Sequence, residues 1–563
     1  MTTHARIAAE DYLEALTAHG IEHLFCNPGT DFAPIVEAFS RAARGNRKVP
    51  RPIVVPHENA AVAMAHGYTM ITGKPQAVML HTNVGTANSI NMLIDASRDR
   101  VPMLLTSGRT PFTESGVDGS RNAHIHWAQE MYDQAGMLRE MVKWDYEMKR
   151  GDQAATVVDR ALELATTSPQ GPVYLSLPRE VLGETVTTPA ESNLARRARP
   201  RTPEPAAADI DRLAEWVAAA RAPLIITGMV GQNPRDAVVL SRLAEAWALP
   251  VIPYTTRHFA ISANHPMFQG SMPRPLLDEA DLVIVLESDV PWIPSKEHPP
   301  ANAHIVQVGE DPLYGRYPMR SFPSDLTITA SALSVLEALE QALEGRRGEH
   351  VEARRTRLTQ RSATLHAGWR DEVTKAGKRD INTLPWLNHC LREVIDRDTI
   401  VVSEYSFRQE YCPLETPGSL FSLSSAGGLG WGLGASLGAK LASPDRLVLS
   451  VLGDGAYMFA NPTACHYVAE VQKLPVLTVI YNNALYGAVR RATLDMYGAG
   501  VAAEADGRFL ADLPAPSFEK IVAAHNGHGE RVEHPGDLPA AFKRAAAAVR
   551  GGQQALVNVV CAP

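Results

Sequence analysis

The sequence predicts an α/β protein built from three doubly wound, parallel-sheet domains. The chain has 563 residues, of which 45% are hydrophobic, so it can bury several cores. Short apolar runs alternate with alanine-rich, helix-like segments, the pattern of βα units in parallel sheets. Two polar connectors divide these units into three blocks, and we expect domains at residues 1–188, 208–343 and 380–563.

The first block begins with an amphipathic helix and continues with five buried strands. The segment MTTHARIAAEDYLEALTAHG carries acids inside its helical pattern and lacks the basic, then apolar profile of a signal peptide. The expected strands lie in EHLFCNPG, PIVVPHE, QAVMLHT, PMLLTSG and PVYLSLP.

The other two blocks repeat this alternation. Pro189–Asp209 is rich in proline, arginine and small residues, which predicts a linker. The middle block has strands in APLIITG, LPVIPY, DLVIVL and AHIVQVGEDP. Residues 345–379 are highly charged and partly helical, and we interpret them as a second connector. The last block has strands in TIVVSE, RLVLSVLGDG, PVLTVIYNN and ALVNVV. The spacing of its strands is similar to that in the first block.

Charge and cysteine content exclude several classes of function. The net charge of −8 comes from interleaved acids and bases without a basic block, which argues against nucleic acid and anionic membranes as partners. No stretch approaches the roughly 20 apolar residues of a membrane helix. The five cysteines are scattered, without a CxxC pair, which fits neither a disulfide framework nor a thiolate zinc site and predicts a reducing cytoplasm. Small-molecule chemistry remains the expected function.

The most informative motif consists of GDG at 453–455 and NN at 482–483, each at the end of an expected strand. Gly453 and Gly455 allow a sharp turn and close approach to a ligand, and Asp454 offers a carboxylate. Asn482 and Asn483 follow the neighbouring strand. A carboxylate, an amide oxygen and a backbone carbonyl suit magnesium that also binds phosphate. Either fragment alone is an ordinary turn, whereas the pair is far more specific.

GDG followed by NN resembles the signature of thiamine diphosphate enzymes of the acetolactate synthase and pyruvate decarboxylase superfamily. The resemblance covers nearly the whole chain and is nearest to the benzoylformate decarboxylases, through NPGTDF, LHTNVGTAN, SSAGGLG and NNALYGAV. It implies that Asp454, Asn483 and the carbonyl of Leu485 hold Mg²⁺ on the diphosphate. The first domain would bind the pyrimidine and the last domain the diphosphate.

The resemblance also implies further cofactor contacts. Leu429 would support the bent cofactor, because a strained conformer needs steric support. The other expected contacts are Pro28, Gly29, Glu404, Ser406, Phe407, Gly428, Gly453, Gly455, Ala456, Tyr486, Gly487 and Ala488.

Four residues of the first domain are the expected catalytic residues. Glu58 matches the glutamate that activates the cofactor; alternatively, it only complements a helix dipole. His81 matches a histidine that faces the substrate, although loop carbonyls could also satisfy it. Thr30 replaces the serine that binds the substrate carboxylate in benzoylformate decarboxylases, and keeps the hydroxyl. Gln129 resembles a glutamine near the active centre of acetolactate synthases; a solvent-facing glutamine is the alternative.

The implied reaction is decarboxylation of a 2-oxo acid. The alternatives are an acetolactate synthase-type carboligase, a 2-hydroxyacyl-CoA or acyloin lyase, and a non-catalytic homologue that binds the cofactor. The cofactor motifs do not separate these reactions, although the chain ends soon after ALVNVV, where acetolactate synthases usually carry a C-terminal lid. Because the family assembles each site between two subunits, the resemblance implies a homodimer or a dimer of dimers.

Overall fold

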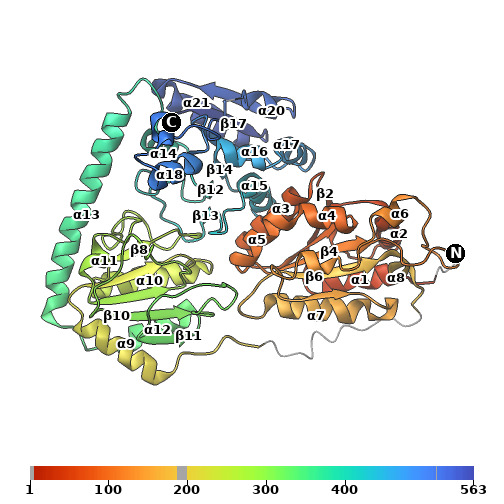
Figure 1. Cartoon of the computed structure of the whole chain (residues 1–563), viewed down its shortest axis with the longest axis horizontal. Coiled ribbons are helices and arrows are strands. Elements are labelled where there is room, and N and C mark those ends of the chain that lie inside the picture. The colour runs from red at the N-terminus through yellow and green to blue at the C-terminus, as the bar shows by residue number, and fades with distance from the viewer. Residues whose placement is uncertain (1–4, 187–199, 515, 563) are drawn as a thin grey trace.

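A computed structural model describes residues 5–186, 200–514 and 516–562, and these form three α/β units (Figure 1). Each unit surrounds one sheet in which all paired strands are parallel. The predicted fold class is therefore confirmed. Most of the predicted linker Pro189–Asp209 lies outside the described residues, and the domain boundaries stay predictions.

The N-terminal sheet has the strand order β2-β1-β3-β4-β6-β5. Its strands are β1 (His23–Asn27), β2 (Arg51–Val54), β3 (Gln76–Leu80), β4 (Met103–Arg109), β5 (Asp145–Glu147) and β6 (Val173–Pro178). Its helices are α1 (Ala8–Ala18), α2 (Ala33–Arg44), α3 (Glu58–Thr72), α4 (Thr82–Asn88), α5 (Ile90–Arg98), α6 (Ile125–Ala128), α7 (Ala154–Thr166) and α8 (Arg179–Gly183).

The middle sheet has the order β11-β10-β9-β7-β8. Its strands are β7 (Pro223–Thr227), β8 (Val251–Pro253), β9 (Leu282–Leu286), β10 (His304–Gly309) and β11 (Leu326–Thr329). Its helices are α9 (Ala207–Ala219), α10 (Pro234–Trp247), α11 (Leu276–Glu279) and α12 (Ala332–Ala342).

The C-terminal sheet has the order β13-β12-β14-β15-β17-β16. Its strands are β12 (Ile400–Glu404), β13 (Leu420–Ser422), β14 (Val448–Gly453), β15 (Leu477–Asn482), β16 (His528–Val532) and β17 (Ala555–Val560). Its helices are α14 (Leu384–Leu391), α15 (Trp431–Ala442), α16 (Asp454–Phe459), α17 (Pro462–Val471), α18 (Gly487–Met496), α19 (Val501–Glu504), α20 (Glu519–Ala523) and α21 (Leu538–Arg550).

The charged connector forms one long helix, α13 (Glu349–Ala376), which joins the middle and C-terminal units along one edge of the molecule (Figure 1). Arg354 fixes this helix, because its buried guanidinium donates to the carbonyl oxygens of Ala220, Trp247 and Ala248. Within the described residues, no helix is both long and apolar enough to span a membrane.

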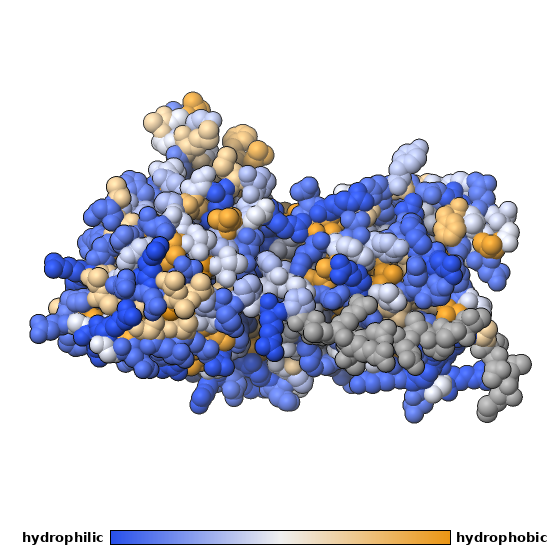
Figure 2. All heavy atoms as spheres, turned by 90° about the horizontal axis from the view of Figure 1, so that it is seen from below, coloured by the Kyte–Doolittle hydropathy of each residue, from blue (hydrophilic) through white to orange (hydrophobic). Residues whose placement is uncertain are grey.

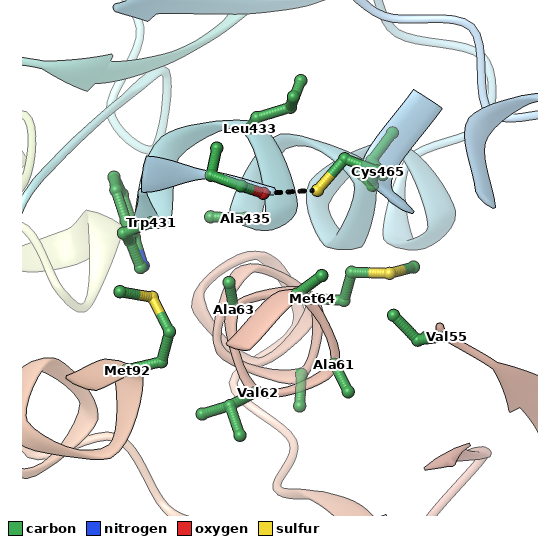
Figure 3. Close-up of a cluster of buried hydrophobic side chains, with 14 of the residues drawn as sticks. Val55, Ala61, Val62, Ala63, Met64, Met92, Trp431, Leu433, Ala435 and Cys465 are labelled. Atoms are coloured by element: carbon green, nitrogen blue, oxygen red, sulfur yellow. Dashed lines mark hydrogen bonds between the residues drawn. The ribbon is translucent and has the colours of Figure 1, made fainter. Parts of the chain in front are cut away.

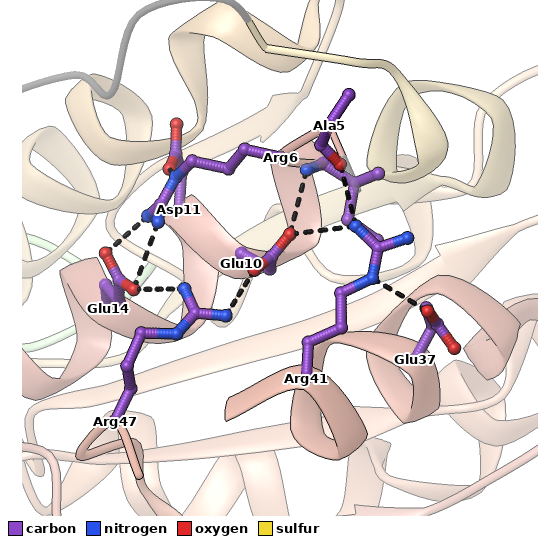
Figure 4. Close-up of polar contacts among 9 residues, drawn as sticks. Ala5, Arg6, Glu10, Asp11, Glu14, Glu37, Arg41 and Arg47 are labelled. Carbon is purple, nitrogen blue, oxygen red and sulfur yellow. Dashed lines mark hydrogen bonds and ion pairs between the residues drawn. The ribbon is translucent and has the colours of Figure 1, made fainter. Parts of the chain in front are cut away.

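The predicted N-terminal helix is present as α1, and ion pairs attach it to its surroundings (Figure 4). Glu10 lies between Arg41 and Arg47, and Arg47 also donates to Glu14 at 2.8 Å. Arg6 pairs with Asp11 and Glu14. These pairs give the two buried acids of α1 charged partners, as burial of a charge requires. The face of the molecule in Figure 2 is mostly hydrophilic, with scattered apolar residues.

The N- and C-terminal units share one hydrophobic core, in which α3 packs against α15 (Figure 3). Trp431 is fully buried beside Met92, and its ring lies 5.4 Å from that of His66. Small residues let the two helix backbones approach closely. A methyl group on Gly67 would lie 2.0 Å from the Ala435 carbonyl oxygen, and one on Gly438 would lie 2.0 Å from that of Met64.

Gly67→Ala is therefore expected to lower the free energy of unfolding by about 1–3 kcal/mol, because the added methyl group overpacks a backbone contact. The control is Gly368→Ala, at an open position of α13 where a methyl group meets no atom within 4 Å. This change is expected to be neutral or to stabilise the helix by about 0.5–1 kcal/mol. Urea unfolding followed by circular dichroism measures both, and equal effects would contradict the close packing.

Candidate active site

Glu58 lies at the carboxyl edge of the N-terminal sheet, as the first residue of α3. Its side chain is buried, and its Oε2 accepts a hydrogen bond from the Asn88 amide at 3.2 Å. Gly85 of α4 lies against it, since a methyl group there would come within 3.3 Å of Oε1. Among the described residues, Oε1 has no hydrogen-bond partner. Asn88 thus orients Glu58 through Oε2, and Oε1 remains available to bind a ligand.

His81 follows β3 and precedes α4. Its Nδ1 lies 2.5 Å from Oδ1 of Asp31, and its Nε2 lies 3.5 Å from the Gln129 amide nitrogen. The hydrogen bond to Asp31 raises the pKa of His81 above its ordinary value, and the charge of Glu58 adds to this effect. The structure therefore brings together Glu58, His81 and Gln129, which the sequence analysis named separately.

Thr30 is exposed, and its hydroxyl lies 3.5 Å from Nε2 of His126. His126 is buried, and its Nδ1 accepts the backbone N–H of Asn122, which leaves Nε2 to carry the proton of the neutral ring. Burial and the nearby Arg179 and Arg121 lower the pKa of His126. The sequence analysis did not name His126 as a site residue, because its position beside Thr30 depends on tertiary structure.

Asp454 lies at the carboxyl edge of the C-terminal sheet, as the first residue of α16. Oδ1 accepts the backbone N–H of Gly455 at 2.8 Å, and Oδ2 accepts that of Leu485 at 3.4 Å. Burial raises the pKa of this carboxyl. Among the described residues, no cationic side chain pairs with it.

The two asparagines after β15 have different environments. Asn482 is buried, donates to the Asn558 side chain and accepts the Ala484 N–H, so it holds the turn. The side chain of Asn483 has no hydrogen bond within the described residues. Ala484 has φ 55°, a left-handed conformation, and after it the N–H of Leu485 reaches Asp454. The turn therefore leaves Asn483 free to bind a ligand.

Glu404 ends β12 and is fully buried. Its two oxygens accept the backbone N–H groups of Gly430 and Gly432, both at 2.8 Å, at the N-terminus of α15. Burial raises the pKa of Glu404 to about 7, because desolvation opposes the charge. Its side chain therefore fixes the loop that carries Leu429.

Two side chains of α5 hold the same loop from the N-terminal unit. Asn91 donates to the Leu429 carbonyl at 3.0 Å, and Asp95 accepts the Gly428 N–H at 3.0 Å. Burial raises the pKa of Asp95 to about 9. Sequence reasoning missed Asn91 and Asp95, since nothing local to α5 indicates a contact so far along the chain.

The remaining predicted contacts follow the same strand ends. The ring of Tyr486 packs on Gly455, where a methyl group would lie 2.9 Å from it. Pro28 and Gly29 follow β1, Ser406 and Phe407 follow β12, Gly453 and Ala456 flank Asp454 and Gly455, and Gly487 and Ala488 begin α18.

These residues fit magnesium and a diphosphate. Asp454 supplies a buried carboxylate without a cationic partner among the described residues, and Asn483 an uncommitted amide. Within residues 5–186, 200–514 and 516–562, the carbonyl of Leu485 accepts only the Gly487 N–H, at 2.9 Å, so one lone pair remains. Hard oxygen ligands of this kind are those that magnesium prefers.

The two groups of residues lie in different units of the chain. Glu58 begins α3 of the N-terminal unit, and Asp454 begins α16 of the C-terminal unit. In the described part of the chain, no hydrogen bond or ion pair joins Thr30, Glu58, His81 or Gln129 to Asp454. We call these two groups the candidate half-sites.

Comparisons with known proteins agree with this division. Three models of thiamine pyrophosphate enzymes match: the N-terminal TPP binding domain at residues 7–137, the central domain at 210–339 and the C-terminal TPP binding domain at 403–559. The benzoylformate decarboxylase of Pseudomonas aeruginosa is 30% identical, over 95% of this chain and 96% of its own length.

More distant relatives span other reactions. A probable acetolactate synthase of Mycobacterium bovis is 26% identical, over 90% of this chain and 88% of its own. A solved structure of the thiamine diphosphate-dependent 4-hydroxybenzoylformate decarboxylase of Rhodococcus jostii has the same fold, with a TM-score of 0.80 and 23% identity over 99% of both chains. From the three matching domains and the decarboxylase relative, the chain belongs to the thiamine pyrophosphate enzyme family.

Proposed function

We propose that this protein is a thiamine diphosphate- and Mg²⁺-dependent lyase that decarboxylates a 2-oxo acid. The observation that carries the proposal is the pair of half-sites: Glu58 and His81 at one sheet edge, and the oxygen ligands around Asp454 at another. The decarboxylase relative at 30% identity supports the reaction class.

Asp454, Asn483 and the Leu485 carbonyl would hold the metal, and Leu429 would support the thiamine from below. When bound, the cofactor supplies a nucleophilic carbon and an electron sink for the bond that breaks. Glu58 would hold a proton against the aminopyrimidine, since Asn88 fixes one oxygen of its carboxylate and leaves the other available.

The other polar residues would act on the substrate. Thr30 is exposed at the edge of the half-site and can donate its hydroxyl to the substrate carboxylate. His81 can move a proton at Nε2, because Nδ1 is committed to Asp31. Gln129 lies beside Nε2 of His81 and can orient the carbonyl oxygen of the substrate.

A second copy of the chain would complete each site. Large apolar side chains are exposed in the segment after the asparagine pair, and exposed patches of this kind commonly mark protein contacts. The exposed fractions are 73% for Met496, 80% for Val501, 87% for Phe509 and 89% for Leu510. We propose a homodimer or a dimer of dimers with this segment at an interface, and an active monomer in solution would contradict it. Five free, buried cysteines support a cytoplasmic location.

Carboligation is the second candidate function. The position of Gln129 next to His81 favours it, because a glutamine in this loop resembles that of acetolactate synthases. Relatives named acetolactate synthase at 26% identity and sulfoacetaldehyde acetyltransferase at 24% also support it.

A panel of 2-oxo acids, assayed with and without an aldehyde acceptor, tests these functions. Release of carbon dioxide with formation of the aldehyde supports the decarboxylase. A product that contains both carbon skeletons supports the carboligase. Absence of turnover with every acid would contradict both and would favour a 2-hydroxyacyl-CoA or acyloin substrate.

A further inference from the structure

We propose that Asp31 is a positioning residue that holds His81 in one orientation and one tautomer, with Nδ1–H donated to Asp31 and Nε2 facing the substrate. The inference rests on the proposed function, in which His81 moves a proton, and assigns a role to a residue outside the predicted site.

The contact itself is the first support. Asp31 lies in a short 3₁₀ helix (Thr30–Phe32) after β1, and only 2% of its side chain is exposed. Its Oδ1 contacts Nδ1 of His81 at 2.5 Å. An ionised carboxylate only accepts, so Nδ1 must carry the proton. Nε2, the other ring nitrogen, then faces the Gln129 amide.

Two glycines make room for this pair. A methyl group on Gly29 would lie 2.1 Å from Nδ1 of His81, and one on Gly108 would lie 1.6 Å from Oδ2 of Asp31. Neither glycine has a positive φ, so the backbone conformation does not require glycine at either position. The lack of space for a side chain does require it. The backbone at the ends of β1 and β4 is therefore shaped around the imidazole and the carboxylate.

The surrounding charges make Asp31 the main partner of His81. The titratable groups that face the ring are Asp31, Glu58 and His126. Asp31 makes the direct hydrogen bond, whereas Glu58 acts through its charge alone. Oδ2 of Asp31 is buried and has no hydrogen-bond partner in the described part of the chain. Within the described residues, the Asp31 side chain therefore makes its hydrogen bond to His81.

The chemistry explains the benefit for proton transfer. A carboxylate behind an imidazole stabilises the imidazolium and keeps the opposite nitrogen aimed at the reacting group. His81 can then donate a proton from Nε2 to the substrate oxygen and recover it, without rotation of the ring.

The test is a titration of His81 in the full-length protein, carrying ¹³C-labelled histidine rings and observed by NMR. The loss of one signal in His81→Gln assigns the resonance. In Asp31→Asn, which keeps the shape but removes the charge, we expect His81 to titrate at lower pH, because its pKa is raised by Asp31 in the native chain. We expect kcat to fall about tenfold or more, with the corresponding limb of its pH profile moved to lower pH.

Gly108→Ala provides a second route, since its methyl group must displace the Asp31 carboxylate while every titratable side chain is retained. It is expected to move the His81 titration in the same direction. Gly183→Ala, at the end of α8 where a methyl group meets no atom within 4 Å, is the control and should leave the titration unchanged.

An unchanged His81 titration in both Asp31→Asn and Gly108→Ala would overturn the proposal, whatever the activity. The NMR measurement does not depend on turnover. If no 2-oxo acid is consumed but the titration of His81 still moves to lower pH in both variants, the proposed function fails while the positioning role of Asp31 stands.

Discussion

Glu58→Gln is expected to lower kcat by about 10²–10⁴-fold while thiamine diphosphate still binds, because the amide cannot exchange a proton with the aminopyrimidine. Asn88 can still contact the oxygen of the new side chain, so the local structure should persist. Deuterium exchange at the reactive thiazolium carbon, followed by NMR after rapid quenching, measures the activation directly. Exchange at the native rate would remove the proposed role of Glu58.

Glu349→Gln is the matched control for this experiment. Glu349 is also the first residue of a helix, α13, but it lies in the connector. If Glu58 only complemented a helix dipole, both variants would lose about 0.3–1 kcal/mol of stability and neither would lose activity. A loss of activity confined to Glu58→Gln would separate the two interpretations.

Asp454→Ala is expected to weaken magnesium-dependent binding of thiamine diphosphate by at least about 100-fold, since the metal would lose its only side-chain carboxylate among the proposed ligands. Calorimetry on metal-stripped protein, with cofactor and Mg²⁺ added together, measures this loss. The control is Asp495→Ala on α18, whose side chain is 71% exposed. Undiminished binding in Asp454→Ala would contradict the metal assignment.

The central strands of each sheet could be predicted because they are short, continuous apolar runs. The expected segments around β3, β9 and β14 are examples, and all three strands are almost entirely buried. The strands that the sequence analysis missed, β5, β11, β13 and β16, all lie at sheet edges, whereas the edge strands β2 and β8 were predicted. Strand β16 (HGERV) is polar and only partly buried, and β13 has three residues, so neither shows a clear period in the sequence.

Local motifs predicted the candidate half-sites, but not the side chains that contact them. Asp31 directly follows Thr30 in the sequence, yet only the folded backbone shows that its carboxylate reaches His81. Glu404 was predicted as a cofactor contact, but the sequence did not show that its side chain anchors the start of α15. Such roles depend on tertiary contacts between residues remote in the chain, which no short motif encodes.

The N- and C-terminal sheets have the same strand order once their strands are renumbered from β1 and from β12. His81 follows the third strand of one sheet, and Asp454 follows the third strand of the other. Duplication of one ancestral unit would leave this arrangement. The residue after the third strand would then serve the proposed proton transfer in the N-terminal unit and the proposed metal site in the C-terminal unit.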